Sequence, residues 1–538
     1  MQLFLILESF VVIFITNQEL MKKLSLLFTL LLINSLSAQV QLGGDIDGEA
    51  SYDNTGHSVS LSADGTKLAI GAIGNDGNGN DAGHVRVFEY SNGSWTQIGS
   101  DINGEPSYED LSGWSVSLSG NGDTVAIGAP FNDGNGSNAG HVRIYEYSAG
   151  SWTQLGADID GEAGGDVSGH SVSLSSDGTI VAIGAPNNIG NGTLGNGNNA
   201  GHVRIYEYSA GSWTQLGADI DGEDVQNYSG YSVSLSADGS IIAIGAPFNN
   251  NNDTINWSPY GHVRVYEYIN GSWTQLGADI DGEAPWDQSG YSVSLSSDGT
   301  TVAIGAIGND GNDTLNSNRG HVRVFEYVNG SWTQLGADID GEAADDQSGY
   351  SVSLSSYGTT VAIGAPYNFK GDTNNIDGEY GHVRVYEYVN GSWTQLGSDI
   401  DGEDHDEEQT GFSVSISSDG NTVANGAHWG NADWSGSVRV YSIGGNTAGV
   451  NSTTLEYQLQ IYPNPTKGYL NVEVPQNMIG QSYSIEVKNS IGQSMFGVAM
   501  NQPLIQINFN SFGAAGSYIL SIKDSGGNVV DTRVIILQ

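Results

Sequence analysis

Residues 290–296 read GYSVSLS, residues 301–306 read TVAIGA, residues 321–327 read HVRVFEY and residues 331–336 read SWTQLG. Each segment is short and rich in β-branched or aromatic residues, and the first alternates serine with apolar side chains. This is the pattern of β-strands that bury one face. A fifth segment, DIDGE at residues 338–342, ends the unit. One unit therefore predicts four strands followed by an acidic connection.

The unit recurs seven times along the chain. Its first segment, G-x-S-V-S-(L/I)-S, begins at Gly56, Gly113, Gly169, Gly230, Gly290, Gly349 and Gly411. Asp-Gly pairs such as Asp298-Gly299 supply the positive φ angles of a tight hairpin between the first two strands, and an Asn-Gly or Ala-Gly pair does the same before SWTQ. Seven four-stranded units predict an all-β fold, a seven-bladed β-propeller over residues 39–443.

The two ends of the repeat array predict how the ring closes. The SWTQ segment occurs six times, and the seventh unit stops after Tyr441. The N-terminal segment Gln39–Gly43 reads QVQLG and matches the missing TQLG strand. We expect this strand to complete the seventh blade, because a closed ring leaves no exposed sheet edges.

Composition excludes several classes of function. The 538 residues include 16 Lys and Arg against 61 Asp and Glu, which gives a formal net charge of −45. Nucleic acid is therefore excluded as a partner, because too few cations are present to replace the counterions of phosphate. Cysteine is absent, so disulfides, cysteine-bound zinc and thiol nucleophiles are also excluded.

The N-terminal 38 residues have the pattern of a signal peptide. Met21-Lys22-Lys23 precedes an apolar run over residues 24–33 and small residues up to Ala38. We expect translation to start at Met21 and the mature chain to begin near Gln39; a short membrane anchor is the alternative. Beyond residue 38 no apolar run reaches the length needed to span a bilayer, so we expect no transmembrane anchor in the mature chain.

The C-terminal part of the sequence differs from the repeats. Residues 444–456 are rich in Gly, Ser, Thr and Asn and are typical of a linker. Residues 457–538 contain short alternating segments at 469–474, 482–488, 505–509 and 518–523. These predict a small immunoglobulin-like β-sandwich.

The repeats resemble the FG-GAP repeat family, best known from the propeller of integrin α-subunits. The resemblance lies in Gly-Tyr-Ser-Val-Ser-Leu at 290–295 followed by Val-Ala-Ile-Gly-Ala at 302–306. The family implies a propeller, and in some integrin blades a calcium loop between the first two strands. Here that connection shrinks to Ser-Asp-Gly-Thr, which is too short to surround Ca²⁺ with six or more oxygens.

The C-terminal segment resembles the type A sorting domain of type IX secretion cargo in Bacteroidetes. The similar stretches are IYPNPT at 461–466, LNV at 470–472, SIGQ at 490–493 and GSYIL at 516–520. The sorting motif comprises Tyr462, Pro463, Asn464 and Pro465. The resemblance implies export through the outer membrane by the type IX machinery, and a final location outside the cell or on its surface.

All the long variable loops should lie on one rim of the propeller, which we call the variable-loop face. They follow the second strand of each unit and share this rim with the DIDGE segments, because alternate connections of antiparallel strands lie on the same side. The loops are residues 75–81, 132–138, 187–199, 249–260, 309–319, 368–380 and 429–434. Binding sites are usually placed on such loops, so we interpret this rim as the binding face.

The acidic DIDGE segments have two interpretations. They could bind cations, or they could cap turns and pair between blades with the repeated arginines; we favour the second. The arginines are Arg86, Arg143, Arg204, Arg264, Arg323, Arg384 and Arg439. The repeated histidines are expected to form hydrogen bonds between blades and not to bind metal. They are His84, His141, His202, His262, His321 and His382.

Two further groups are candidate binding residues. Oxygen-bearing side chains at short spacing could chelate Ca²⁺, with solvated turns as the alternative. These candidates are Asn75, Asp76, Asn78, Asn80 and Asp81, then Asn309, Asp310, Asn312 and Asp313. Tryptophans that break the repeat could stack on sugar rings, with core packing as the alternative. They are Trp257, Trp286, Trp429 and Trp434.

The sequence contains no recognisable catalytic motif: H-E-x-x-H, a nucleophile elbow and a phosphate loop are all missing. We therefore assign no catalytic residues and predict a non-catalytic binding or adhesion protein with a glycan or protein ligand. The alternatives are a secreted polysaccharide-active enzyme, a lyase or glycosidase, and a structural surface-layer protein.

Overall fold

A computed structural model of the chain describes residues 39–106, 109–189, 199–250, 258–311, 317–369, 380–403 and 408–443. In the C-terminal part it describes residues 460–462, 469–474, 483–489, 494–502, 504–508, 516–523 and 529–537. The predicted signal peptide and linker lie outside these ranges. The chain forms two compact units that divide between Asn446 and Thr447, and each unit is described by itself.

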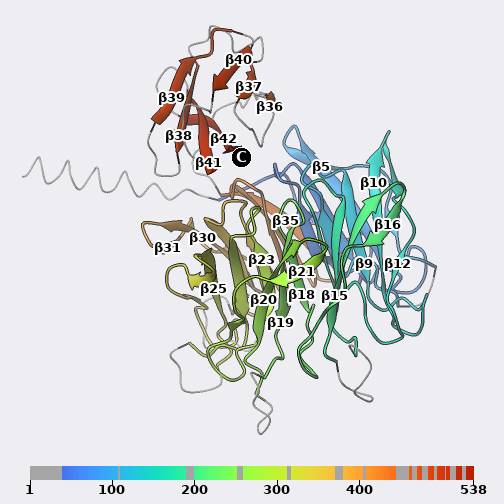
Figure 1. Cartoon of the computed structure of the whole chain (residues 1–538). Helices are drawn as coiled ribbons and strands as arrows, with labels where there is room; N and C mark the ends of the chain where they lie inside the picture. Colours follow the sequence, from blue (N-terminus) through green and yellow to red (C-terminus); the bar gives the residue numbers. More distant parts are fainter. Residues whose placement is uncertain are drawn as a thin grey trace, which may run out of the picture. The chain divides into compact units, whose positions relative to one another are not determined.

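Each repeat folds into one antiparallel sheet, which is one blade (Figure 1). In the fifth blade, β23 (Ser289–Leu295), β24 (Thr301–Ala306), β25 (His321–Val328) and β26 (Ser331–Gln334) are neighbours in that order. The DIDGE segment adds a two-residue strand, β27 (Ile339–Asp340), which pairs with the start of β25 beside β26. The four predicted strands are confirmed, and the structure adds this fifth short one.

The other blades repeat this arrangement. The first strands are β3 (Thr55–Leu61), β8 (Ser115–Leu118), β13 (Ser171–Leu174), β18 (Ser232–Leu235), β28 (Ser351–Leu354) and β33 (Ser413–Ile416). The second strands are β4 (Lys67–Ala72), β9 (Thr124–Ala129), β14 (Ile180–Ala185), β19 (Ile241–Ala246), β29 (Thr360–Ala365) and β34 (Thr422–Ala427). The third strands are β5 (His84–Ser91), β10 (His141–Ser148), β15 (His202–Ser209), β20 (His262–Ile269), β30 (His382–Val389) and β35 (Ser437–Ser442).

The outer strands are β6 (Ser94–Gln97), β11 (Ser151–Gln154), β16 (Ser212–Gln215), β21 (Ser272–Gln275) and β31 (Ser392–Gln395). The remaining two-residue strands are β2 (Ile46–Asp47), β7 (Ile102–Asn103), β12 (Ile159–Asp160), β17 (Ile220–Asp221), β22 (Ile280–Asp281) and β32 (Ile400–Asp401). The outer strand of the seventh blade is β1 (Val40–Gln41), which pairs with β35 from the other end of the repeat array. The predicted closure by the N-terminal strand is therefore confirmed.

The blades follow one another in a closed ring. Each first strand contacts the next, from β3 to β8 and onward to β33, and β33 contacts β3 again. The hydrophobic core lies between neighbouring blades; for example, Val263 and Ile280 of the fourth blade pack against Leu295 and Ile304 of the fifth. The fold is a seven-bladed β-propeller, and the first strands are innermost.

The two serines of the G-x-S-V-S segment join neighbouring blades through their innermost strands. The first serine donates to the glycine carbonyl of the next blade, as Ser58 does to Gly113, over 2.7 to 2.9 Å in all seven blades. The second serine accepts from a backbone N–H in the first strand of the next blade, as Ser173 Oγ does from Leu235, the last residue of β18. Both series return to the first blade, through Ser413 and Ser415. The S-V-S alternation therefore places the valine in the hydrophobic core and both serines in hydrogen bonds to the next blade.

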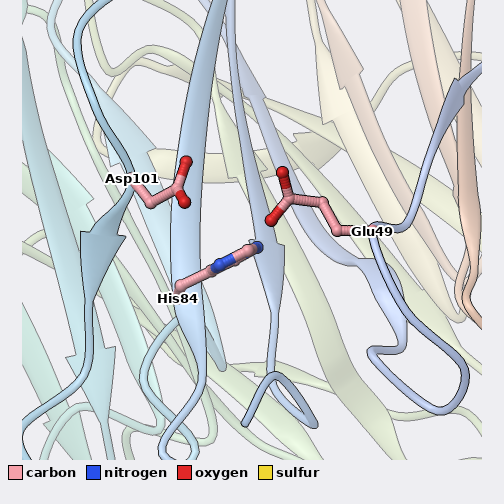
Figure 2. A group of neighbouring side chains, drawn as sticks. All are labelled: Glu49, His84 and Asp101. Carbon is pink, nitrogen blue, oxygen red and sulfur yellow. The ribbon is translucent and has the colours of Figure 1, made fainter. Parts of the chain in front are cut away.

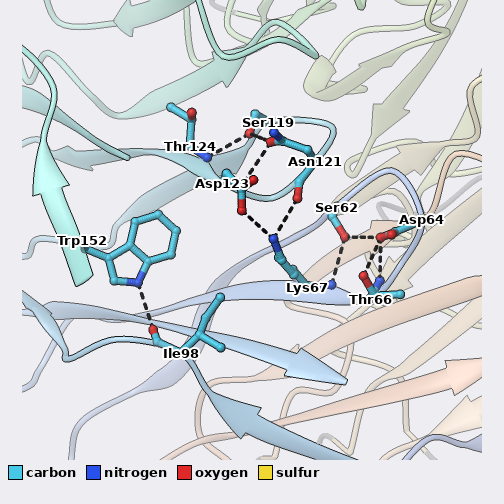
Figure 3. A network of polar contacts seen from close by, with 10 residues as sticks. All are labelled: Ser62, Asp64, Thr66, Lys67, Ile98, Ser119, Asn121, Asp123, Thr124 and Trp152. Atoms are coloured by element: carbon cyan, nitrogen blue, oxygen red, sulfur yellow. Dashed lines mark hydrogen bonds and ion pairs between the residues drawn. The ribbon is translucent and has the colours of Figure 1, made fainter. Parts of the chain in front are cut away.

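A third ring of hydrogen bonds lies at the first hairpins, on the rim opposite the variable loops. The backbone N–H of Ala63 donates to the Gly120 carbonyl, and the series continues from blade to blade until Ser418 donates to Ala63. Figure 3 shows two of these hairpins, tied together by Lys67 Nζ, which lies 2.6 Å from Asp123 Oδ1. Asp64 Oδ1 accepts from the Ser62 hydroxyl and from Thr66, so this carboxylate shapes the turn itself.

The outer strands are held by a tryptophan in each SWTQ segment. Its indole Nε1 donates to a backbone carbonyl of the preceding blade, as Trp152 does to Ile98 at 2.9 Å (Figure 3). The same bond forms at Trp95, Trp213, Trp273, Trp332 and Trp393. At the seventh blade Gln39 replaces the tryptophan, and its Nε2 donates to the carbonyls of Leu396 and Ser398 at 3.2 and 2.6 Å.

The C-terminal unit is the small β-sandwich that the sequence predicts. One sheet contains β36 (Gln460–Tyr462), β37 (Tyr469–Glu473) and β40 (Leu504–Asn508). The other contains β38 (Ser484–Asn489), β39 (Ser494–Ala499), β41 (Gly516–Lys523) and β42 (Val529–Leu537). Leu470, Val487 and Leu520 are fully buried in its core. Tyr462 ends β36, whereas Pro463, Asn464 and Pro465 lie outside the described residues.

No helix among the described residues is long and apolar enough to cross a membrane.

The serine bonds predict a large effect from a small change. Replacing Ser173 by alanine removes the acceptor of the Leu235 N–H, and we expect the full chain to lose about 1–3 kcal/mol of unfolding free energy. Thermal unfolding of the variant measures this. Ser212→Ala is the matched control, because the Ser212 hydroxyl is exposed on an outer hairpin. Equal unfolding temperatures for the two variants would contradict the assigned role of the serine.

Candidate functional site

The variable-loop face brings the DIDGE segments and the long loops together. The start of each third strand pairs with the DIDGE strand, as His141 does with Asp160 in the second blade. The loop between second and third strands ends at that same histidine. The DIDGE segments and the long loops therefore lie on the same rim, as the strand order predicts.

The repeated arginines connect the acidic segments of neighbouring blades. Arg86 Nη2 donates to the carbonyl of Asp47 at 2.8 Å, and its Nη1 lies 3.8 Å from Glu49 Oε1. The same ion pair forms at Arg204, Arg264, Arg323 and Arg384 with separations of 3.6 to 3.8 Å. The expected pairing between arginine and DIDGE carboxylates is present.

The repeated histidines lie beside the same carboxylates. Figure 2 shows the His84 imidazole between Glu49 and Asp101. In the third blade His202 Nδ1 is 3.9 Å from both Glu162 and Asp219, which is too long for a direct hydrogen bond. Burial, with a smaller contribution from the charge of Arg204, lowers the pKa of His202 to about 4. The imidazole of His202 is therefore neutral at pH 7 and forms no direct hydrogen bond to these two carboxylates, and the expected hydrogen bonds of the histidines between blades stay a prediction.

A ring of seven aromatic side chains surrounds the central axis at this rim. The residue after the glycine of each G-x-S-V-S segment supplies one member: His57, Trp114, His170, Tyr231, Tyr291, Tyr350 and Phe412. Neighbouring ring centroids lie 4.6 to 5.7 Å apart, and Phe412 closes the circle with His57 at 5.1 Å. We call this ring the aromatic collar. The collar is not among the features predicted from the sequence, although the aligned repeats show an aromatic residue at this position in every blade.

The collar carries no charge at neutral pH. Burial lowers the pKa of His57 to about 3, with a smaller contribution from His170, whose own pKa burial lowers to about 4. Burial also raises the pKa of Tyr231, Tyr291 and Tyr350. An uncharged aromatic surface thus lies at the centre of an acidic rim.

Exposed aromatic side chains extend from this centre. Tyr52 is 60% exposed, and its ring centroid lies 5.1 Å from that of Trp434, which is 41% exposed. Trp429 is also exposed, and its neighbour His428 stacks on Phe412 of the collar at 3.8 Å. We call Tyr52 and Trp434 the aromatic platform. The sequence pointed to the two tryptophans, but nothing in the repeat pattern distinguished Tyr52.

Several of these aromatics stand on unusual backbone. Tyr52, Trp286 and Trp434 have φ angles of 69°, 75° and 55°, in the left-handed region that bulky residues rarely adopt. Tyr52 and Trp286 occupy equivalent places in their repeats, where the third blade has Gly165. Trp286 is 54% exposed. The equivalent residues Glu109, Gln226 and Asp345 are also left-handed, so the repeat sets this backbone, and Tyr52 and Trp286 differ in placing an exposed aromatic side chain on it.

The first candidate calcium loop is held by hydrogen bonds of its own. Asn75 is buried, donates to Asp53 and accepts from the Gly77 N–H. Asp76 accepts from the Asp81 N–H, and Asn78 donates to the Gly104 carbonyl of the next connection. Asn80 donates to Asp81, whose pKa is raised by burial and by Asp76 and Glu109. These oxygens shape the loop, and calcium binding here stays a prediction.

The second loop is described in part. Asn309 donates to the buried Asp287 and accepts from Gly311, and Asp310 accepts from the N–H groups of Ser317 and Asn318. The remaining candidates of this loop, Asn312 and Asp313, lie outside the described residues, as does Trp257.

Two segments of the chain match known families. Residues 460–537 match the family described as secretion system C-terminal sorting domain. Residues 95–145 match the FG-GAP repeat. The sorting domain assigns the chain to the type IX secretion route, with a location at the cell surface or outside the cell, and implies contact with the secretion machinery.

Comparison with curated proteins gives no match. Among solved structures, the chain is similar to a putative 6-phosphogluconolactonase from Bacteroides uniformis, with 11% identity, a TM-score of 0.44, and coverage of 82% of this chain and 99% of that one. A periplasmic gluconolactonase from Pseudomonas aeruginosa has 16% identity, a TM-score of 0.41 and coverage of 64% and 86%. These identities and TM-scores are too low to assign either activity to this chain.

The lowered histidine pKa in the collar predicts a pH-dependent stability. Unfolded His57 titrates near 6.5 and folded His57 near 3, so below pH 6.5 the unfolded chain binds more protons and the folded state loses stability. We expect His57→Phe to gain stability over the native chain as pH falls from 6.5 to 4.5, by up to about 1.4 kcal/mol per pH unit. Thermal unfolding of both chains across this range measures the difference.

Phenylalanine is a matched replacement, since Phe412 occupies the same place in the seventh blade. A stability difference that stays constant between pH 7 and pH 4.5 would show that His57 is not held neutral by the collar.

Proposed function

We propose that this secreted protein binds glycans without catalysing a reaction, and that the variable-loop face of the propeller is its binding surface. The observation that supports the proposal is the set of exposed aromatic side chains on left-handed backbone at this face. A folded protein gains little by keeping Trp286 or Tyr52 exposed at positions where glycine fits. Ligand binding explains why such residues are kept.

The chemistry of the platform suits a sugar ring. Tyr52 and Trp434 offer tilted aromatic faces at 57°, and aromatic faces pack against the apolar C–H faces of sugars. Polar groups lie beside them: the Ser51 hydroxyl donates to Asp433 at 3.0 Å, and Asp433 is exposed. An aromatic surface with a few oriented polar groups is the usual composition of a small-molecule site.

The charge of the face narrows the ligand class. The acidic DIDGE segments lie on the same face as the platform, and the chain as a whole carries −45. Such a surface repels polyanions such as sulfated or uronic-acid-rich chains. We therefore propose a neutral glycan, bound by stacking and hydrogen bonds.

The platform gives a direct test. Tyr52→Ala and Trp434→Ala should each weaken binding to a neutral glycan by about tenfold or more, because a stacked aromatic contributes on the order of 1.4 kcal/mol. Glycan-array screening of the full chain, followed by calorimetry on the best ligand, measures the loss. Tyr357→Ala is the matched control, since Tyr357 is equally exposed but lies in a hairpin on the opposite rim. Equal losses for all three variants, or turnover of the glycan by the native chain, would refute the proposal.

Trp286 allows binding and stability to be separated. In Trp286→Gly the backbone keeps φ near 75° without strain, as Gly165 does at the equivalent position. We expect the thermal unfolding temperature to stay constant or rise while glycan affinity falls. A lower unfolding temperature with unchanged affinity would identify Trp286 as a packing residue.

A further inference from the structure

We propose that the interblade groups of Glu, His and Asp on the variable-loop face bind divalent transition-metal ions of the zinc type. Each group takes its glutamate from one DIDGE segment, and its histidine and aspartate from the next blade. At least five such groups occur among the described residues, including Glu49, His84 and Asp101 in Figure 2. This proposal is independent of glycan binding.

The three side chains already lie near the positions of metal ligands. In each group, one nitrogen and two carboxylate oxygens lie within 4.8 Å of one another. In the third blade, His202 Nδ1 is 3.9 Å from Glu162 Oε2 and 3.9 Å from Asp219 Oδ2. Ligand atoms of a tetrahedral zinc site lie about 3.4 Å apart, as follows from bond lengths near 2.1 Å. Small rotations of the carboxylates would bring the atoms to that distance.

Neighbouring side chains hold the carboxylates in this orientation. Gln215 Nε2 donates to Asp219 Oδ1 at 2.5 Å, which leaves Oδ2 on the side of the histidine. Arg204 lies 3.8 Å from Glu162 Oε1 and leaves Oε2 on the same side. Metal ligands in proteins are typically oriented by such outer hydrogen bonds and ion pairs.

The histidines have unsatisfied polar atoms although they are buried. His84, His202, His262, His321 and His382 are each 1–2% exposed. Within the described part of the chain, the Nε2 atom of each has no hydrogen-bond partner. The Nδ1 atoms of His202 and His262 are 3.8 to 3.9 Å from their carboxylates, beyond hydrogen-bond range. The carboxylates lie on the Nδ1 side of His202 and His262, so an ion bound there would give Nδ1 a partner and would leave Nε2 without one.

In the seventh blade, which lacks the histidine, the repeat arginine contacts both carboxylates of the group. Ser437 replaces the histidine there, and Arg439 Nε lies 3.0 Å from Asp45 Oδ2, the aspartate of that group. Its Nη2 lies 3.8 Å from the glutamate of the group, Glu403, and 2.6 Å from Glu408. Among the ion pairs that the structure describes, the arginines of the other blades pair only with the glutamate of their group and not with its aspartate. A guanidinium thus contacts both carboxylates at the one site without an imidazole.

The groups are accessible to an ion from solvent. Glu162 and Asp219 are 46% and 32% exposed, and Asp101 lines a pocket of about 250 Å³ together with Tyr145 and Trp152. One imidazole nitrogen with two carboxylate oxygens suits Zn²⁺, whereas Ca²⁺ prefers six or more oxygens. A bound ion would link adjacent blades in a chain that has no cysteine.

Equilibrium dialysis of the chelator-treated full chain against Zn²⁺, with elemental analysis, tests the proposal. We expect about six zinc ions per chain and a higher thermal unfolding temperature with zinc than with EDTA. His262→Ser reproduces the residue of the seventh blade and should lower the number by one. His170→Tyr is the matched control, because His170 belongs to the collar and Tyr231 is its neighbour there; it should keep the full number. A parallel dialysis against Ca²⁺ distinguishes ion binding at these groups from ion binding at the predicted calcium loops.

Two results would overturn the proposal: no zinc bound by the native chain, or an unchanged number in His262→Ser. If that variant fails to fold, X-ray absorption of the native zinc-loaded chain decides the question. One nitrogen and two carboxylate oxygens per zinc are expected, and a shell without nitrogen would exclude the histidines as ligands.

Discussion

The hydrogen bonds between the innermost strands are the constraint on which the propeller depends. Each blade donates a serine hydroxyl and a hairpin N–H to carbonyls of the next blade, and its second serine accepts from a backbone N–H of that blade. These bonds return to their starting blade only if seven units are present and in register. The same serines fix which side chains of the first strand enter the core, so sheet register and ring geometry are set together. Closure then fixes the carboxylates, imidazoles and collar on one rim.

Much of the fold could be predicted from the sequence because the same pattern of strands and turns recurs in seven repeats. The strands, the tight Asp-Gly turns and the N-terminal strand Gln39–Gly43 follow from local pattern. The short DIDGE strands could not be predicted, because two residues carry no periodicity. The collar was also missed: residues such as His57, Trp114 and Tyr231 differ in type, and only the ring geometry shows that they are neighbours.

The candidate site was less predictable than the fold, and the reason is conformational. Trp286 and Trp434 were recognisable as departures from the repeat, but the left-handed backbone beneath them is visible only in three dimensions. Tyr52 comes from the first connection and Trp434 from the last loop, so their contact depends on closure of the ring. The grouping of Glu162, His202 and Asp219 likewise joins two blades. Sequence spacing alone does not bring such residues together.

The bond from Gln39 to Ser398 joins residues 359 positions apart and has a consequence for the order of folding. Its strand is made first but pairs with the last blade, so the circle remains open until the whole propeller sequence is available. Contacts this distant form slowly, because the entropy of a long loop must be lost before they form. In a chain exported by the type IX route, closure of the ring is therefore delayed, because the N-terminal strand can pair with the seventh blade only when both ends of the propeller are in the same compartment.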